Sequence, residues 1–359
     1  MPGNTSDKTR PPKRLRSDGE RRRLKRDTMA LPALSRRDKL KRASQWVREH
    51  SGQIFAAIKD RIYHDGLKHY RALHAARRFH ENTSLLRAIV GSNQAGKTLA
   101  AVSEISRIVR GYHPLYPKRN GTLLCVGIDN DHIGQNMWNE LAGEGSYECL
   151  VDEETHVPRG VRVNPLNPTE IDPADLARKS EWFPSPPILP YREWDWNDGV
   201  NRGVVWEDKG ASVPHVVNIR STGWKMLFHP GGGNPRRGIK VHGAWFDEET
   251  PRAWFFETIP RLVRWKGRLI WSATPQTANE ELMQLIQQAR DGSELVDVTW
   301  LYLEDNPFIS AEGKKLLYDT FAAMSDEDLQ VRYYGKPALL GRLVYPMFDM
   351  ALMGTDGFK

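Results

Sequence analysis

Short apolar runs alternate with segments of helical periodicity through most of this chain of 359 residues. Residues 98–109 and 280–289 place apolar side chains along one face of a helix. The apolar runs have the pattern of strands that are covered on both faces of a parallel sheet, and they span 85–90, 122–128, 239–246 and 267–273. This alternation predicts an α/β fold in which a mainly parallel central sheet is flanked by helices.

The remaining patterns are shorter. They predict a helix at 133–141, a hairpin around Ser221-Thr222-Gly223, a late strand at 294–303, and helices at 313–324 and 326–334.

The first strand leads into a loop that matches the pattern G-x-x-x-x-G-K-T: Gly91-Ser92-Asn93-Gln94-Ala95-Gly96-Lys97-Thr98. Glycine lets the backbone turn so that successive N–H groups point at phosphate oxygens, and the following helix presents its positive end to the same anion. Lys97 can reach the β- and γ-phosphates, and the Thr98 hydroxyl can ligate Mg²⁺. The loop therefore predicts a site for ATP and Mg²⁺, the alternative being a glycine turn beside a surface lysine.

Acidic residues follow the third apolar run. In a phosphate-loop ATPase, a carboxylate at the end of such a strand holds Mg²⁺, and the next carboxylate polarises the attacking water. We therefore predict that Asp247 holds the metal and that Glu248 acts on the water, with Glu249 as the alternative base. The strand at 267–273 leads to Thr274, which can sense the γ-phosphate, although a plain strand-to-loop turn is the alternative.

Two other groups of residues are candidates for the same site. Tyr70 and Phe79, which precede the first strand, are candidates for contacting the adenine base, and core packing explains each at least as well. Arg236 and Arg237, on a glycine-rich loop before the acidic strand, are candidates for the arginine that stabilises charge in the transition state. Arg119 is a further candidate, and for each arginine a phosphate-backbone contact or a solvated charge is an equal alternative.

The formal charge of +7 and the pI near 9.3 favour a polyanionic partner. Much of this excess lies in residues 1–27, which hold ten Lys and Arg against four acidic residues, so that the remainder is nearly balanced at 42 basic and 41 acidic residues. The two cysteines, Cys125 and Cys149, predict no disulfide framework. No apolar stretch approaches 18 residues, so we predict no membrane span.

Several of these motifs together resemble the large terminase subunit of tailed bacteriophages, the motor that packs DNA into procapsids. The resemblance spans roughly residues 70–350 and rests on the phosphate loop, Arg237-Gly238, Trp245-Phe246-Asp247-Glu248, Ser272-Ala273-Thr274-Pro275, Asp305-Asn306-Pro307, and Tyr334-Gly335 followed by Gly341-Arg342-Leu343-Val344-Tyr345-Pro346. It implies a RecA-like P-loop NTPase fold of the catalytic-glutamate type and ATP-driven translocation of double-stranded DNA. It also implies a homo-oligomeric ring on a portal protein, a small terminase subunit as partner, and action in the host cytoplasm.

Two features depart from the family pattern. Some members carry arginine in the phosphate loop where this chain has Asn93. The chain also leaves no room for the family's nuclease domain, so we expect no DNA cleavage from it.

On this interpretation the chain divides into four parts. Residues 1–30 form a disordered basic tail, 31–80 a helical region, 81–335 the P-loop ATPase domain with an irregular insertion at about 145–212, and 336–359 a linker toward a nuclease domain. The insertion is rich in Pro and Trp, and we expect it to form short elements of its own. Its tryptophans either stack on bases or pack a small core.

Two functions of other classes are alternatives. A helicase is one, because Ser272-Ala273-Thr274 also resembles a helicase motif, but we find no second motor-like module after residue 275. The other is a non-catalytic DNA-binding scaffold that holds nucleotide as a structural ligand, and the Asp247-Glu248 pair argues against it.

Overall fold

The structure is a computed structural model that describes residues 36–207, 213–235, 238–275 and 279–337. Contacts divide the chain into two units, Met1–Ile58 and Lys59–Lys359. Among the residues described, no helix combines the length and the apolar character needed to cross a membrane.

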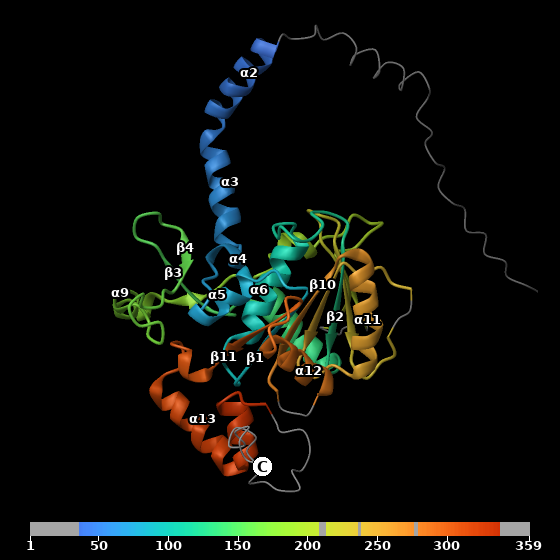
Figure 1. Cartoon of the computed structure of the whole chain (residues 1–359). Helices are drawn as coiled ribbons and strands as arrows, with labels where there is room; N and C mark the ends of the chain where they lie inside the picture. The colour runs from blue at the N-terminus through green and yellow to red at the C-terminus, as the bar shows by residue number, and fades with distance from the viewer. Residues whose placement is uncertain (1–35, 208–212, 236–237, 276–278, 338–359) are drawn as a thin grey trace, which may run out of the picture. The chain divides into compact units, whose positions relative to one another are not determined.

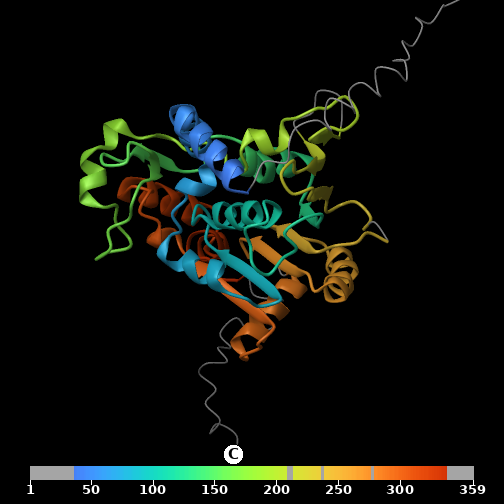
Figure 2. The ribbon, with the colours of Figure 1, turned by 90° about the horizontal axis from the view of Figure 1, so that it is seen from above.

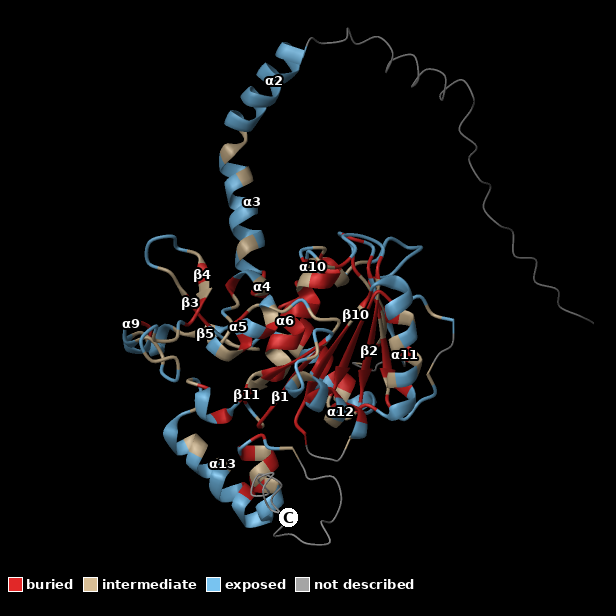
Figure 3. Ribbon diagram, in the orientation of Figure 1, coloured by how far each residue is buried: buried red, intermediate tan, exposed pale blue. Residues whose placement is uncertain are grey.

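The first unit contains the helix α2 (Arg36–Glu49) and the beginning of α3 (Ser51–Tyr63). No residue of α2 is buried, as Figure 3 shows by its pale colour. Six of its 14 residues are Lys or Arg, and the apolar side chains of Leu40 and Trp46 are 61% and 54% exposed. The helix is therefore a basic surface on every side that the structure describes.

The second unit is built on an eight-stranded sheet in the order β11-β1-β10-β9-β2-β8-β7-β6. Its strands are β1 (Leu86–Gly91), β2 (Thr122–Gly127), β6 (Val204–Trp206), β7 (Pro214–Asn218), β8 (Lys225–Pro230), β9 (Gly243–Asp247), β10 (Arg268–Ala273) and β11 (Val296–Leu301). The pairs from β11 to β8 are parallel, and β8-β7 and β7-β6 are antiparallel. The predicted α/β fold with a mainly parallel sheet is confirmed, as is the hairpin of β7 and β8.

Helices cover both faces of the sheet, because alternate side chains of each buried strand point to opposite sides. The helices α5 (His74–Glu81) and α6 (Lys97–Val109) pack on the face that carries Ile89, Cys125, Trp245 and Ile270. The helices α11 (Arg252–Trp265) and α12 (Glu280–Arg290) pack on the face that carries Val90, Val126, Phe246 and Trp271. Figures 1 and 2 show the two layers on either side of the strands.

The predicted insertion does form short elements of its own. A three-stranded antiparallel sheet in the order β4-β3-β5 is followed by short helices: β3 (Glu148–Val151), β4 (Pro158–Gly160), α9 (Pro173–Ala177), η2 (Lys179–Glu181), β5 (Phe183–Pro184) and α10 (Tyr191–Trp194). Its tryptophans take part in packing, since the rings of Trp138 and Trp194 lie 5.2 Å apart edge to face. Trp206, which is 40% exposed, lies 6.2 Å from Trp138.

Several short helices join these layers: α4 (Gly66–His69), α7 (Asn130–His132), the π-helix η1 (Ile133–Trp138), α8 (Asn139–Ala142), η3 (Leu303–Asp305), α13 (Ala311–Met324), α14 (Asp326–Asp328) and the π-helix η4 (Leu329–Tyr333). The segments predicted as helices at 133–141 and 326–334 are helical, and each contains a π-helical stretch.

The segment after β11 lies directly on the loop that follows β1. Leu303 N donates to Ser92 Oγ at 2.5 Å, and Asn93 N donates to the Arg332 carbonyl at 2.7 Å. Asn306 Nδ2 donates to the Gln94 carbonyl at 2.7 Å. The backbone of the loop is thus held from outside by residues more than two hundred positions away in the sequence.

Gly91 is the position where this packing leaves no room for a side chain. Its φ is +147°, and a β-carbon built on it would lie 1.7 Å from the Leu301 carbonyl oxygen. We predict that Gly91→Ala lowers the free energy of unfolding by about 3 kcal/mol or more, because both the backbone angle and the contact must change. Urea unfolding monitored by tryptophan fluorescence measures this.

Gly232→Ala is the matched control, since Gly232 has no heavy atom within 4 Å of a built β-carbon. A Gly91→Ala chain as stable as the Gly232→Ala chain would contradict the close packing of β11 on the loop.

Candidate nucleotide site

The loop between β1 and α6 has the backbone of an anion-binding turn. Gln94 and Gly96 adopt positive φ angles of 58° and 86°, and Gly96 is the residue at which α6 begins. Alternation of left- and right-handed residues makes successive N–H groups converge on one point, and the N-terminus of α6 adds its partial positive charge there. Binding of phosphate by residues 91–98 stays a prediction.

The Lys97 side chain lies inside this turn. It is 6% exposed, and its Nζ donates to the Ser92 carbonyl at 2.6 Å. Burial lowers the pKa of Lys97, while the Glu248 and Asp247 carboxylates act in the opposite direction. The ammonium group is therefore held in a water-poor site with two carboxylates as its charged neighbours.

Asp247 is the last residue of β9 and is 2% exposed. The Ser272 hydroxyl, from the adjacent strand β10, donates to its carboxylate. Burial raises the pKa of Asp247 to about 6, against the opposing effects of the Ser272 hydroxyl and Lys97. A buried carboxylate with so little positive charge around it is stabilised when a cation binds to it.

Glu248 follows in a left-handed conformation, with φ of 57°. Its backbone is fixed by two hydrogen bonds, from Glu248 N to the Ser272 carbonyl at 2.7 Å and from Trp271 Nε1 to the Glu248 carbonyl at 2.9 Å. Its carboxylate accepts from Thr274 N at 2.8 Å, and burial raises its pKa. The turn aims the second carboxylate into the cavity that the first one lines.

Thr274 connects this carboxylate to the phosphate loop. Its hydroxyl oxygen lies 3.0 Å from Asn93 Oδ1 and 3.3 Å from Glu248 Oε1. A hydroxyl has one proton, so it can donate to only one of these two acceptors at a time. The position is the one predicted to sense the γ-phosphate, and that role stays a prediction.

Loop and carboxylates line one cavity of about 690 Å³, a volume within the range of ordinary ligand sites. Residues Asn93 to Thr98 line it together with Asp247, Glu248 and Thr274. The structure thus brings together all the predicted residues of the loop that can face a ligand and the predicted acidic pair. It does not bring Glu249 there.

Many residues that line this cavity were not predicted from the sequence, and two of them lie close to Asp247. His132 and Glu140 come from the helical segment after β2, and His132 Nε2 lies 3.4 Å from Asp247 Oδ2. Burial, with Asp247 nearby, raises the pKa of Glu140 to about 7, and burial lowers that of His132. No spacing marks them, although the polar break at Asp129-Asn130 after the β2 run is a signal that a strand ends at this edge.

The other candidate residues do not all lie at the cavity. Tyr70 lines the cavity, whereas Phe79 is fully buried in the core and does not line it, which is the core-packing alternative stated for it. Arg119 is exposed and does not line the cavity. Arg236 and Arg237 lie outside the described residues.

The donor set fits Mg²⁺ held together with phosphate oxygens. Within the described residues no group of three or more His, Cys, Asp and Glu side chains could hold an ion without further ligands. Mg²⁺ commonly takes one or two protein oxygens and completes its shell with water and substrate phosphates. Asp247 and the Thr98 hydroxyl, which line the same cavity, are the residues that would hold it.

The raised pKa of Asp247 gives a prediction for the chain in the presence of a chelator. Because the folded pKa of about 6 lies above the ordinary value of 3.8, ionisation destabilises the folded state as the pH rises through this interval. Asp247→Asn should then raise the free energy of unfolding by about 2–3 kcal/mol at pH 8, and by less than about 1 kcal/mol near pH 4.5. Urea unfolding at the two pH values measures the difference.

Asp319→Asn, at an exposed position of α13, is the control and should change the stability little at either pH. A destabilising effect of Asp247→Asn at pH 8 would show that the buried carboxylate is fully compensated within the protein.

No family model and no curated protein matches the chain by sequence. Solved structures that are similar to it include two of the Large Terminase ATPase domain of Thermus phage P74-26, one of them a mutant. The identities are 13% and 11%, each match covers 76% of this chain and 96% of that chain, and the TM-score is 0.43 in both. The structural likeness of the chain to this domain is therefore distant.

Proposed function

We propose that the chain is a Mg²⁺-dependent ATPase of the large terminase type, which uses ATP hydrolysis to move double-stranded DNA into a viral procapsid. The observation that carries the ATPase is that Lys97, Asp247 and Glu248 line one cavity with the phosphate loop. The DNA-moving role is supported by the ordered set of terminase-like motifs and by the basic N-terminal region.

The residues divide the chemistry among themselves. The N–H groups of the loop and Lys97 bind the phosphates, and Thr98 and Asp247 hold Mg²⁺, which when bound withdraws negative charge from the phosphate oxygens. Glu248 orients the attacking water and accepts its proton, which a carboxylate with a raised pKa does more readily than an ordinary one. Thr274 holds that carboxylate in place through its N–H.

The assembly follows from the family resemblance. We propose a homo-oligomeric ring that acts with a portal protein and a small terminase subunit in the host cytoplasm. An arginine from a neighbouring subunit, with Arg236 and Arg237 as the candidates, stabilises charge in the transition state. The alternatives are a helicase, which strand displacement would reveal, and a nucleotide-holding scaffold, which would bind ATP without turnover.

The first test is turnover by the Glu248→Gln variant. We expect it to bind ATP as the wild-type chain does and to hydrolyse it on the order of 10²–10⁴-fold more slowly, because the amide cannot take the proton from water. Phosphate release measures hydrolysis, and equilibrium binding of a fluorescent ATP analogue measures affinity. Lys97→Ala should lose affinity as well.

Glu249→Gln is the matched control, since it removes the neighbouring charge from a residue that does not line the cavity. If Glu248→Gln kept ordinary turnover while Glu249→Gln lost it, our assignment of the base to Glu248 would be wrong. A wild-type chain that binds ATP without hydrolysing it would leave only the scaffold.

The second test concerns the DNA. Residues 1–49 hold 16 of the 52 basic and 6 of the 45 acidic residues, so their net charge is +10 and that of the remaining chain is −3. Attraction to DNA phosphates should therefore depend on this region. Replacing Arg37, Lys41 and Arg48 of α2 by alanine should weaken duplex binding and lower the slope of log affinity against log salt by about 2–3, with little effect on the helix.

The control removes the same charge from exposed positions of the second unit, Lys225, Arg290 and Lys315. Fluorescence anisotropy of a labelled duplex at several salt concentrations compares the two variants. An equal change in both slopes would mean that DNA responds to the total charge of the chain and not to α2.

A further inference from the structure

The chemistry above leaves one part of the cavity lining unused, the segment that follows β2. In the sheet, β2 is the neighbour of β9 on the side away from β10, and the segment after it contains α7, η1 and α8. Four of its side chains line the cavity: His132, Gln135, Asn136 and Glu140. The first of them reaches the acidic pair directly, since His132 Nε2 lies 3.4 Å from Asp247 Oδ2.

The register of the sheet brings His132 to this place. Val126 of β2 pairs with Phe246 of the parallel strand β9. The next residue of each strand, Gly127 and Asp247, therefore lies at the same edge of the sheet. A chain that turns into a helix directly after β2 consequently begins that helix beside the Asp247 carboxylate.

Two contacts fix the His132 side chain. A β-carbon built on Gly127 would lie 2.8 Å from His132 Nδ1, so the ring packs on the backbone at the end of β2. Asp129 is the N-cap of α7 and accepts from His132 N at 2.8 Å, which holds the turn that carries the ring. The side chain is 9% exposed, so packing and not solvent determines its position.

The placement of the ring also determines which of its nitrogens carries the proton. Ile128 N donates to His132 Nδ1 at 3.4 Å. An amide N–H can only donate, so Nδ1 is the acceptor and the neutral ring carries its proton on Nε2. The N–H of the ring therefore lies on the side that faces Asp247 Oδ2.

The Asp247 carboxylate thus has a different neutral neighbour at each of its oxygens. The Ser272 hydroxyl donates to Oδ1, and His132 Nε2 lies beside Oδ2. An ionised carboxylate has about four lone-pair sites, so two donors can fix its plane and still leave acceptor sites for a cation. Neither of these donors carries a net charge, so the carboxylate keeps its negative charge.

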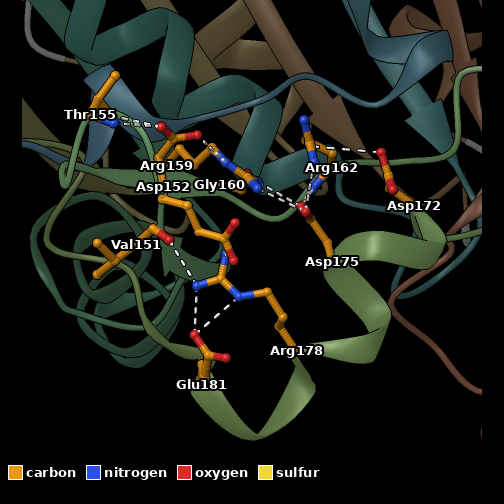
Figure 4. Close-up of polar contacts among 11 residues, drawn as sticks. Val151, Asp152, Thr155, Arg159, Gly160, Arg162, Asp172, Asp175, Arg178 and Glu181 are labelled. Carbon is orange, nitrogen blue, oxygen red and sulfur yellow. Dashed lines mark hydrogen bonds and ion pairs between the residues drawn. The ribbon is translucent and has the colours of Figure 1, made fainter.

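Another buried carboxylate of the chain has the opposite surroundings. Asp175 in the insertion is 1% exposed, and it accepts from Arg159 at 2.6 and 2.8 Å and from Arg162 Nη2 at 3.0 Å (Figure 4). Burial raises the pKa of Asp175, but these bonds outweigh burial and hold the pKa well below its usual range. Guanidinium groups already balance the charge of Asp175, whereas the neutral donors at Asp247 orient a carboxylate whose charge stays available.

We propose that His132 is a positioning residue for Asp247, whose carboxylate it orients toward Mg²⁺ through the Nε2–H group. The inference rests on the proposed binding of Mg²⁺ and nucleotide and goes beyond it, because it makes the segment after β2 part of the metal site. Loss of a group that orients a metal ligand commonly lowers the metal affinity or the activity by about 10–100-fold. The imidazole itself is not the ligand, since Mg²⁺ prefers oxygen.

The test compares two amide substitutions of His132. In His132→Gln the amide nitrogen takes the place of Nε2 and can still donate to Asp247, whereas the shorter amide of His132→Asn takes the place of Nδ1 and cannot reach it. Isothermal titration calorimetry with the imido analogue of ATP, which resists hydrolysis, would be run in Mg²⁺ and in EDTA. The ratio of the two Kd values measures how much Mg²⁺ strengthens nucleotide binding.

For His132→Asn we expect this ratio to fall about tenfold, with the Kd in EDTA within about twofold of the wild-type value, because only the metal loses an oriented ligand. His132→Gln should keep the ratio within about threefold of the wild type. Equal ratios for the two variants, or equal weakening in Mg²⁺ and in EDTA, would overturn the inference.

Turnover of ATP separates positioning from catalysis. If His132 acts only through Asp247, the Mg²⁺ concentration at half-maximal rate should rise about tenfold in His132→Asn, while kcat at saturating Mg²⁺ stays within about threefold. A fall of kcat that excess Mg²⁺ does not restore, with an unchanged effect of Mg²⁺ on binding, would make His132 a catalytic residue beside Glu248. That result would also overturn the inference.

Asp129→Ala carries the test if His132→Asn does not fold, because it loosens the turn that holds His132 from an exposed position. It should lower the ratio by about threefold. Asp131→Ala removes the same charge from the same helix and should leave the ratio unchanged, so an equal fall in both would overturn the inference. A wild-type chain that does not bind the analogue, or binds it equally with and without Mg²⁺, would refute the proposed nucleotide or metal binding and the inference with it.

Discussion

One lysine and two carboxylates that share a single cavity, with Lys97 and Asp247 buried, impose the main constraint on this structure. Burying a charge is costly unless other charges and hydrogen bonds replace the lost water. Burial raises the pKa of both Asp247 and Glu248, and the single positive charge of Lys97 offsets this effect only in part. Such a group of charges persists only where the surrounding fold holds it in place. It is typical of sites in which a bound ligand supplies the missing positive charge.

The order of the strands in the sheet holds these three charged groups together. Parallel strands end at the same edge, so the loop after β1 and the carboxylates after β9 face each other across the end of β10. The strand between them supplies Ser272 to one carboxylate and Thr274 to the other. The segment after β11 then closes the loop from the outside through Ser92, Asn93 and Gln94. Four neighbouring strands thus contribute to one site, and none of them could be displaced without moving a charged group.

The sequence was informative for those features of the site that depend on residues close together in the chain. Glycines at fixed spacing, followed by a lysine and a threonine, are typical of one loop geometry. A largely apolar run that ends in Asp247-Glu248 indicates the end of a strand. The fold class and the core of the site could therefore be predicted. His132, Glu140 and Tyr147 could not, because each reaches the cavity through tertiary contacts from segments without a motif. The same limit left both alternatives open for Tyr70 and Phe79. Tyr70 and Phe79 both precede β1, and only the packing of α5 under α6 decides which of them lies in the core.

Thr274 links Glu248 to the phosphate loop, because its hydroxyl has a single proton and two acceptors within reach. Asn93 Oδ1 and the Glu248 carboxylate are both acceptors, and the Thr274 hydroxyl lies within reach of both but has one proton to give. The Glu248 carboxylate is therefore joined to the phosphate loop through Thr274, the residue that follows β10. Arginine at the position of Asn93 could not accept this bond, since a guanidinium group has no acceptor. The link is thus a property of a chain with asparagine there, and it ties the departure in the loop to the strand end that follows β10.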